Sequence, residues 1–332
     1  SPLTALSISS MEAMMALLPD FRTNRMAASI LGPMDFFGHP YTAKAEENGF
    51  GKPAADFPDG VRIRYYDEAS HSYSYMESTV QIRHFIRALH DHFAALGLLD
   101  KVRITADEPD DIERYRASVA AIREEGPGFR FSISINKAEF TTEFNDVMSD
   151  AIPSLKCLAN DYEFIKENLI GHEGKRISWY VCCRPHFPNT FLKSHLLESR
   201  FICILTSILG LDGFLRWNYT VWPEKPRERL IFRSPAWLAG DMNFVYPGYN
   251  GAPLLSMRYK ALLRGVEDFE LMTMAKSKGH DVDKIMKSLL MDRTSLAALS
   301  ESGYDESEPA KPFSTDEKDY EEFRGILYGL LA

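Results

Sequence analysis

Short runs of alternating apolar and polar residues, separated by segments of helical periodicity, make up most of the chain from residue 101 onward. The run 101–106 alternates in this way, which predicts a short strand, because neighbouring side chains in a strand point to opposite faces. Comparable apolar runs predict strands at 26–31, 61–66, 129–135, 154–159, 176–183 and 211–217. A long stretch rich in glycine, proline and aromatic residues, 36–60, is expected to be an inserted loop, with 61–66 as a hairpin arm.

Between these runs, apolar residues recur at three- and four-residue steps, which predicts helices. The strongest pattern runs from Ile82 to Leu96 and ends at Gly97, a residue type that suits the end of a helix. Further helices are expected at 10–22, 110–125, 139–150, 162–169, 190–209, 256–278 and 316–331.

Repeated strand–helix units of this length predict a parallel sheet. No Gly-x-Gly-x-x-Gly motif is present, so we expect a (β/α)8-type TIM barrel rather than a dinucleotide-binding sheet. Only six or seven strands are visible, and the first is expected either upstream of Ser1 or at 3–8. The barrel, with its long inserted loop, is predicted to occupy residues 1–280 as a catalytic domain. Residues 281–332 are predicted to form a helical extension packed on it.

The composition narrows the class of partner. A net charge of −9 argues against nucleic acid and anionic membranes, and no apolar run approaches the roughly 20 residues of a membrane span. The four cysteines have no Cys-x-x-Cys spacing, which argues against structural zinc. We expect the adjacent pair Cys182 and Cys183 to be small core residues in a reducing compartment such as the cytoplasm. The oligomeric state is not predicted.

The candidate chemistry begins at Asp107-Glu108-Pro109, where the strand 101–106 should end. Proline cannot continue a strand ladder, so Pro109 marks the exit into a loop. Two carboxylates in one pocket push their pKa values apart, which provides an acid and an anion at neutral pH. The alternative is a solvated acidic turn whose charges, with Asp110 and Asp111 following, favour the start of the next helix.

The other predicted strand ends carry polar and aromatic residues, and in a barrel these ends share one rim. They are Asn136, Lys137, Asn160, Asp161, Tyr162, Arg184, His186, Asn189, Trp217, Asn218, Tyr219 and Trp222. Each residue alone could equally have a structural role, as a core, capping or surface residue. Together, aromatic rings and hydrogen-bonding groups suit a sugar, whose ring faces stack while its hydroxyls bond.

Three functions remain open at this point. A retaining glycosidase with a protein nucleophile needs a second carboxylate about 5 Å from the acid. The stretch 177–190 contains no acidic residue, which leaves Asp161 as the candidate nucleophile on a neutral sugar, with Glu108 as acid. Alternatively, a 2-acetamido sugar supplies its own nucleophile, and two adjacent acids meet the needs of that reaction. The third possibility is a non-catalytic carbohydrate-binding or scaffold protein.

Several motifs carry a family resemblance: Asp107-Glu108-Pro109, Gly213–Pro223, Gly240–Gly248, Ser256–Arg258 and Arg264–Leu271. With these motifs, roughly residues 80–280 resemble the catalytic domain of glycoside hydrolase family 123, the β-N-acetylgalactosaminidases. Family members resemble two-part proteins with an N-terminal β-sandwich, for which the chain shows no counterpart.

The resemblance implies a glycosidase that removes terminal β-linked N-acetylhexosamine, most often N-acetylgalactosamine, from a glycan through an oxazolinium intermediate, without metal or cofactor. Asp107 would stabilise the acetamide and Glu108 would be the general acid/base. The sugar site is expected to include Asn160, Asp161, Trp217, Asn218, Tyr219, Trp222 and Tyr246. Asp241 and Arg258 are expected to pair as a structural brace.

Overall fold

The computed structural model forms two compact units, Ser1–Ala151 with Glu173–Lys175, and Ile152–His172 with Arg176–Ala332. The residues it describes are 28–29, 53–54, 57–61, 64–67, 69–75, 79–183, 188–216, 238–241, 243–249, 252–290 and 313–332. The predicted helix 10–22 and the predicted loop 36–60, apart from a few strand residues, lie outside these ranges. The predicted domain boundary near residue 280 stays a prediction.

The first unit is built on parallel strands. β1 (Ala28–Ser29) pairs in parallel with β6 (Val102–Asp107), which pairs in parallel with β7 (Arg130–Ile135). β8 (Met148–Pro153) is the next neighbour of β7. Two antiparallel ladders precede them in the chain, one of β2 (Pro53–Ala54) with β3 (Phe57–Val61) and one of β4 (Arg64–Asp67) with β5 (Ser72–Tyr75).

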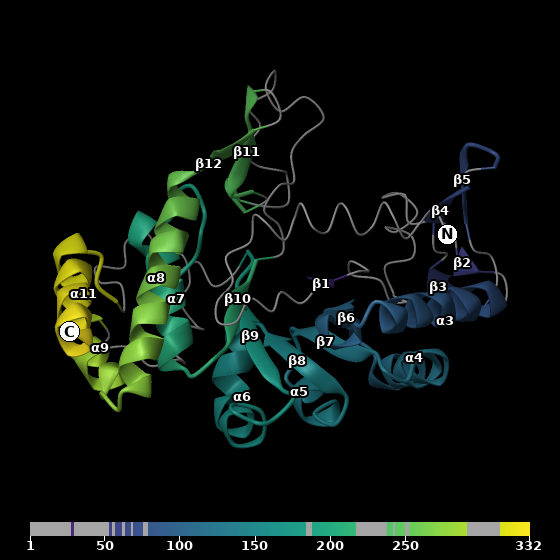
Figure 1. The fold of residues 1–332 in the computed structure, drawn as a ribbon, viewed down its shortest axis with the longest axis horizontal. Helices are drawn as coiled ribbons and strands as arrows, with labels where there is room; N and C mark the ends of the chain where they lie inside the picture. Colours follow the sequence, from purple (N-terminus) through teal and green to yellow (C-terminus); the bar gives the residue numbers. More distant parts are fainter. Residues whose placement is uncertain are drawn as a thin grey trace. The chain divides into compact units, whose positions relative to one another are not determined.

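Helices cover one face of β6 and β7. The connections are α3 (Thr79–Ala95), the short 3-10 turn η1 (Leu99–Lys101), α4 (Ile112–Glu125) and α5 (Glu139–Glu143). The three α-helices are labelled in Figure 1. The guanidinium of Arg123 on α4 lies 5.6 Å from the ring centroid of Phe131 in β7. Tyr115 on α4 also packs edge-on against Phe144 at 4.9 Å. The face that carries Phe131 is therefore the helix-covered, apolar face.

The second unit combines strands with a helical layer. Ser154 forms a parallel bridge to Tyr180 in β9 (Arg176–Tyr180), and β9 pairs in parallel with β10 (Gly213–Leu215). Its helices are α6 (Leu155–Asn168), α7 (Leu196–Ile208), α8 (Met257–Ser277), α9 (Val282–Leu290) and α11 (Glu317–Leu331). β11 (Val245–Pro247) and β12 (Pro253–Leu255) form a hairpin before α8.

Close packing joins α7 to α8. A Cβ atom added at Gly265 of α8 would lie 2.5 Å from the carbonyl oxygen of Arg200 on α7, so glycine permits the approach of the two helices. In Figure 1, α7, α8 and α11 lie side by side at the C-terminal end of the chain.

Most predicted elements are confirmed, and two neighbouring ones are wrong. The strands near 101, 129, 176 and 211 and the helices at 110–125, 256–278 and 316–331 are present. The predicted helix 139–150 ends at residue 143 and is followed by β8, and the predicted strand 154–159 is the start of α6. Ser154 caps that helix by accepting a hydrogen bond from the Cys157 amide, and Leu155, Leu158 and Ile165 bury one helical face.

The chain has an α/β fold, but the described strands do not close into a barrel. β1 pairs only with β6 and β10 only with β9 among them, so both are edge strands. The predicted TIM barrel is therefore not confirmed. Within the described ranges, no helix has the length and apolar character needed to cross a membrane.

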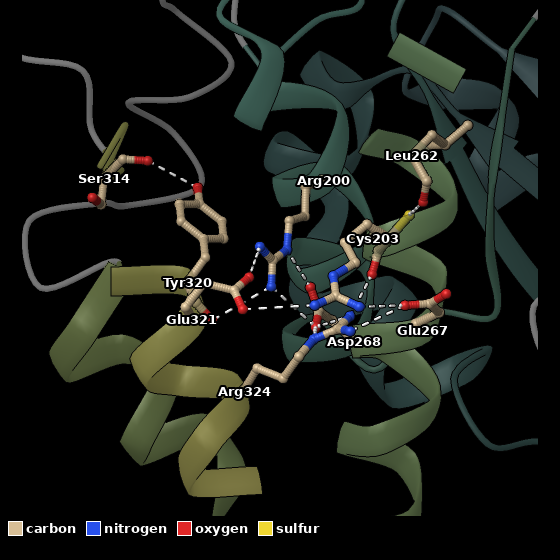
Figure 2. A network of polar contacts seen from close by, with 10 residues as sticks. Arg200, Cys203, Leu262, Glu267, Asp268, Ser314, Tyr320, Glu321 and Arg324 are labelled. Carbon is tan, nitrogen blue, oxygen red and sulfur yellow. Dashed lines mark hydrogen bonds and ion pairs between the residues drawn. The ribbon is translucent and has the colours of Figure 1, made fainter. Parts of the chain in front are cut away.

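A buried ion-pair network connects three helices of the second unit (Figure 2). Asp268 on α8 is fully buried and binds two arginines, Arg200 of α7 at 2.6 Å and Arg324 of α11 at 2.7 Å. Arg200 also donates to Glu321, and Arg324 donates to Glu267. One carboxylate thus holds two buried cations, and Arg264 binds the two partly exposed carboxylates, so three acidic and three basic side chains balance.

We predict that Asp268→Asn destabilises the protein by about 3–5 kcal/mol, because it leaves two buried guanidinium groups without their shared anion. The measurement is the free energy of unfolding from urea denaturation followed by circular dichroism. Glu143→Gln is the matched control, because its ion pair with Arg116 is about half exposed on both sides and should change stability by less than about 1 kcal/mol. Equal losses in the two variants would contradict the prediction.

Candidate active site

The acidic pair lies at the carboxyl end of β6, as the sequence predicts. Asp107 is the last residue of the strand and is in register with Ser134 of β7. The Glu108 amide donates to the Ser134 carbonyl oxygen at 3.0 Å, which extends the pairing by one residue. The backbone of both acids is therefore fixed by the neighbouring strand.

Glu108 has a left-handed backbone conformation with φ of 51°. This region is costly for a residue with a side chain, and a following proline restricts it further toward extended geometry. Pro109 follows Glu108 and is itself buried. Strain of this kind costs on the order of 1–3 kcal/mol and is concentrated at functional sites. The turn also frees the Glu108 side chain from the strict alternation of the strand that ends at Asp107.

The turn after β7 holds the turn after β6. The Asn136 side-chain amide donates to Glu108 Oε2 at 3.0 Å, and Lys137 Nζ donates to the Asp110 carbonyl oxygen at 3.1 Å. Both donors come from the two residues that directly follow β7. The amide N–H needs an acceptor, so this contact is made to an unprotonated Oε2. Asn136 was named in the sequence only as a strand-end residue, and this contact gives it a specific role.

The face of the strands that bears Asp107 is polar. Alternation places Arg103 and Thr105 on the same face as Asp107, and the register aligns Thr105 and Asp107 with Ser132 and Ser134. Arg103 is buried and its Nε lies 2.5 Å from Asp150 Oδ2 in β8. The acidic pair therefore stands at the end of a polar face, opposite the apolar face that the helices cover.

The pKa of Asp107 is raised to about 6, first by burial of its carboxyl and then by the negative charge of Glu108. The residue as a whole is exposed, but protein atoms around the carboxyl still disfavour its charge. The sequence predicted one raised pKa in the pair and gave the role of acid to Glu108, whereas the raised pKa belongs to Asp107. At pH 7 and above, Asp107 is mostly ionised.

Asn160 and Asp161 do not lie at a strand end. Both are on α6, within its second turn, where Asn160 is exposed and Asp161 is partly buried. Their placement in the predicted site followed from the strand predicted at 154–159, which is a helix. The positional reason for Asp161 as a nucleophile therefore no longer holds.

Two buried arginines hold the loop that leads to Tyr246. Arg258, in the first turn of α8, donates to the carbonyl oxygens of Gly240 at 2.7 Å and Asn243 at 2.6 Å, and to the Tyr246 hydroxyl at 3.3 Å. Arg216, directly after β10, binds the Asp241 carboxylate. The predicted pairing of Asp241 with Arg258 is therefore wrong, because Asp241 pairs with Arg216 while Arg258 binds main-chain carbonyl oxygens.

Four predicted sugar-contacting residues, Trp217, Asn218, Tyr219 and Trp222, lie outside the described residues, as do Arg184 and His186. In the part of the chain that the structure describes, no group of three His, Cys, Asp or Glu residues could hold a metal ion.

A comparison with known protein families identifies the family of this chain. Residues 34–275 match the family described as glycoside hydrolase 123, catalytic domain. The chain belongs to glycoside hydrolase family 123. The match covers the acidic pair, the two arginines and Tyr246, so the sequence resemblance is confirmed at the level of the family.

A solved family 123 glycoside hydrolase from Clostridium perfringens, studied for glycolipid glycan hydrolysis, has a similar fold. Its TM-score is 0.59 at 19% identity, and the similarity covers 81% of this chain and 48% of that chain. This family 123 chain therefore spans about half the length of that relative, and the likeness shows the fold alone. No curated protein matches the sequence.

We predict that Asp107→Asn stabilises the folded protein at pH 8 by on the order of 1 kcal/mol, allowing for solvent screening at this partly exposed site. A raised pKa means that the folded state binds the proton more tightly than the unfolded state. The contribution of Asp107 to stability is therefore present below pH 3.8 and is lost as pH rises through about 6. The advantage of the variant should shrink at pH 5.

The measurement is the melting temperature of wild type and variant at pH 5 and pH 8. Asp110→Asn controls for the removal of one negative charge from the same exposed loop. An advantage of Asp107→Asn that is the same at both pH values would contradict the prediction.

Proposed function

We propose that this family 123 chain removes terminal β-linked N-acetylhexosamine, and specifically N-acetylgalactosamine, from a glycan, with retention of configuration through an oxazolinium intermediate. The observation that carries the proposal is the Asp107–Glu108 pair, held at one strand end by the turn that follows β7. Family membership supports glycoside hydrolysis, and the adjacent acids support the substrate-assisted form of that reaction.

Glu108 acts as general acid and then as general base. In its protonated form Glu108 donates its carboxyl proton to the glycosidic oxygen as the bond to the anomeric carbon breaks, and the resulting carboxylate later accepts a proton from the attacking water. The hydrogen bond from Asn136 to Oε2 limits rotation of the Glu108 carboxyl. The left-handed backbone at Glu108 aims the side chain away from its strand position.

Asp107 acts on the acetamide. Its carboxylate accepts the acetamide N–H and so orients the carbonyl oxygen toward the anomeric carbon, where that oxygen attacks to form the oxazolinium ring. The negative charge of Asp107 then stabilises the positive charge of the ring. This role needs an ionised Asp107, so activity should fall as pH drops below about 6.

The polar strand face supports closure of the strands into a barrel. A doubly wound sheet carries helices on both faces and therefore needs apolar residues on both. Here one face carries the buried pair Arg103–Asp150 and the serines 132 and 134, which suits the interior of a barrel leading to a polar substrate. We place the sugar beside the Asp107–Glu108 pair, at the carboxyl end of β6.

The proposed sugar site includes the aromatic and amide residues of the family motifs. Trp217, Asn218, Tyr219, Trp222 and Tyr246 would stack on the sugar ring or bond to its hydroxyls. Tyr246 is the member of this set that the structure describes, and it is half-buried with its hydroxyl held by Arg258. Asn160 and Asp161 are less suited to this role, because they lie on a helix.

We predict that the chain hydrolyses nitrophenyl N-acetyl-β-galactosaminide and that Glu108→Gln lowers the rate by about 10²–10⁴-fold on a substrate with a poor leaving group. The loss on the nitrophenyl substrate should be smaller, because that leaving group needs less protonation. The measurement is kcat/KM for the nitrophenyl glycoside and for a disaccharide with the same terminal sugar. Similar losses on both substrates would argue against Glu108 as the acid.

We predict that Asp107→Asn lowers kcat/KM on acetamido sugars by about 10²–10³-fold and leaves hydrolysis of the matching neutral galactoside, if any, unchanged. The same variant should bind a thiazoline mimic of the oxazoline more weakly than wild type does. Equal loss on both sugars would favour a protein nucleophile. Binding of the thiazoline by wild type without any turnover would mark a carbohydrate-binding protein instead.

A further inference from the structure

Two adjacent cysteines, Cys182 and Cys183, point to the same side of the chain. Their Sγ atoms lie 3.8 Å apart, just after β9 ends. Neighbouring side chains inside a strand point to opposite faces, so this proximity depends on the turn that the chain makes at the strand end. The sequence predicted both cysteines to be core residues. Instead Cys183 is exposed and Cys182 is partly exposed.

The other two cysteines, Cys157 and Cys203, are buried. Cys157 on α6 is 2% exposed and Cys203 on α7 is fully buried. Burial raises the pKa of the Cys203 thiol well above its usual value, which removes the thiolate that reacts with metals and electrophiles. Reagents that seek sulfur should therefore reach the pair Cys182–Cys183 and leave the other two cysteines untouched.

Buried side chains hold the backbone at Val181 and Cys182, on the N-terminal side of the pair. Asn189, which is fully buried, donates through its side-chain amide to the Cys182 carbonyl oxygen at 3.0 Å. Arg216 donates to the Val181 carbonyl oxygen at 2.6 Å. The backbone N–H of Asn189 in turn donates to the buried Glu198 carboxylate at 3.0 Å. The two thiols are therefore presented on a held turn, and little further ordering is needed to use both at once.

The spacing suits a bridging atom better than a disulfide. A disulfide brings its sulfurs to about 2.05 Å and usually spans Cα atoms about 4.4–6.8 Å apart, whereas adjacent Cα atoms are about 3.8 Å apart. Closing the pair directly would therefore strain the backbone. A soft atom with bonds of about 2.3 Å to each sulfur spans the present separation at a roughly tetrahedral angle.

We propose that Cys182 and Cys183 form a binding site for one soft, thiophilic centre that binds two sulfurs and keeps a substituent of its own, such as a trivalent arsenical. Among the described residues, no third His, Cys, Asp or Glu joins the pair to make a larger metal cluster. A centre that two sulfurs satisfy, alone or with its own substituent, fits best. The site is independent of the proposed glycosidase reaction.

Phenylarsine oxide is the probe. Its arsenic forms two As–S bonds, and the oxygen leaves as water with the two thiol protons, so no oxidant or reductant is needed. Intact-protein mass spectrometry should show one phenylarsenic group on the folded wild type in the presence of excess glutathione. A dithiol such as dimercaptopropanol should remove it.

Either single substitution, Cys182→Ser or Cys183→Ser, should weaken binding by about 10²-fold or more, because the second sulfur then has to come from solution. Cys203→Ser and Cys157→Ser are the matched controls and should bind as wild type does, with circular dichroism confirming that each variant folds. The proposal is overturned if the folded wild type forms no adduct under these conditions, or if either single variant holds the adduct as tightly as wild type.

Discussion

The register between β6 and β7 is the constraint on which the candidate site depends. It aligns Asp107 with Ser134 and lets the Glu108 amide take the Ser134 carbonyl as its partner. A slip of one residue would turn Asp107 toward the helix-covered face and carry Arg103 there with it. Because an unpaired arginine among Phe131 and its neighbours would be very costly, the buried pair Arg103–Asp150 helps to hold the strands in the alignment that the acids need.

The second unit relies on buried guanidinium groups in a different way. Arg258 donates hydrogen bonds to main-chain carbonyl oxygens of the loop before β11. Arg216 donates to the Val181 carbonyl oxygen and to Asp241. Arg200 and Arg324 both bind Asp268. The planar, forked donor of arginine suits such positions, because it satisfies several acceptors at fixed angles. Loops that would otherwise be weakly ordered are thereby tied to helices, and Tyr246 is held at the end of one such loop.

The sequence predicted the parts of the fold that local patterns determine. β6 and β7 alternate cleanly, and Pro109 marks the end of the first, so the acidic pair could be placed at a strand end. Residues 139–159 were misread because β8 is short and directly precedes α6, and its apolar residues merge with those of the helix. Ser154 as a helix cap was the signal that could have separated them.

Contacts between distant residues could not be predicted from local patterns. Arg200 and Asp268 are 68 positions apart. Asp241 could pair with Arg216 or with Arg258, and only the packed structure shows that the partner is Arg216. The contact from Asn136 to Glu108 likewise depends on two turns that meet only when their strands pair. Local pattern therefore located the acids, while tertiary packing determines which groups support them.

The left-handed backbone at Glu108 has a consequence for protein engineering. Glycine would occupy this position with less strain, so a redesign guided by stability alone would favour it there. Such a redesign would remove the candidate acid while raising the free energy of unfolding. Position 108 therefore has to be held fixed in any attempt to stabilise the chain, and folding yield alone is a misleading guide to the quality of its variants.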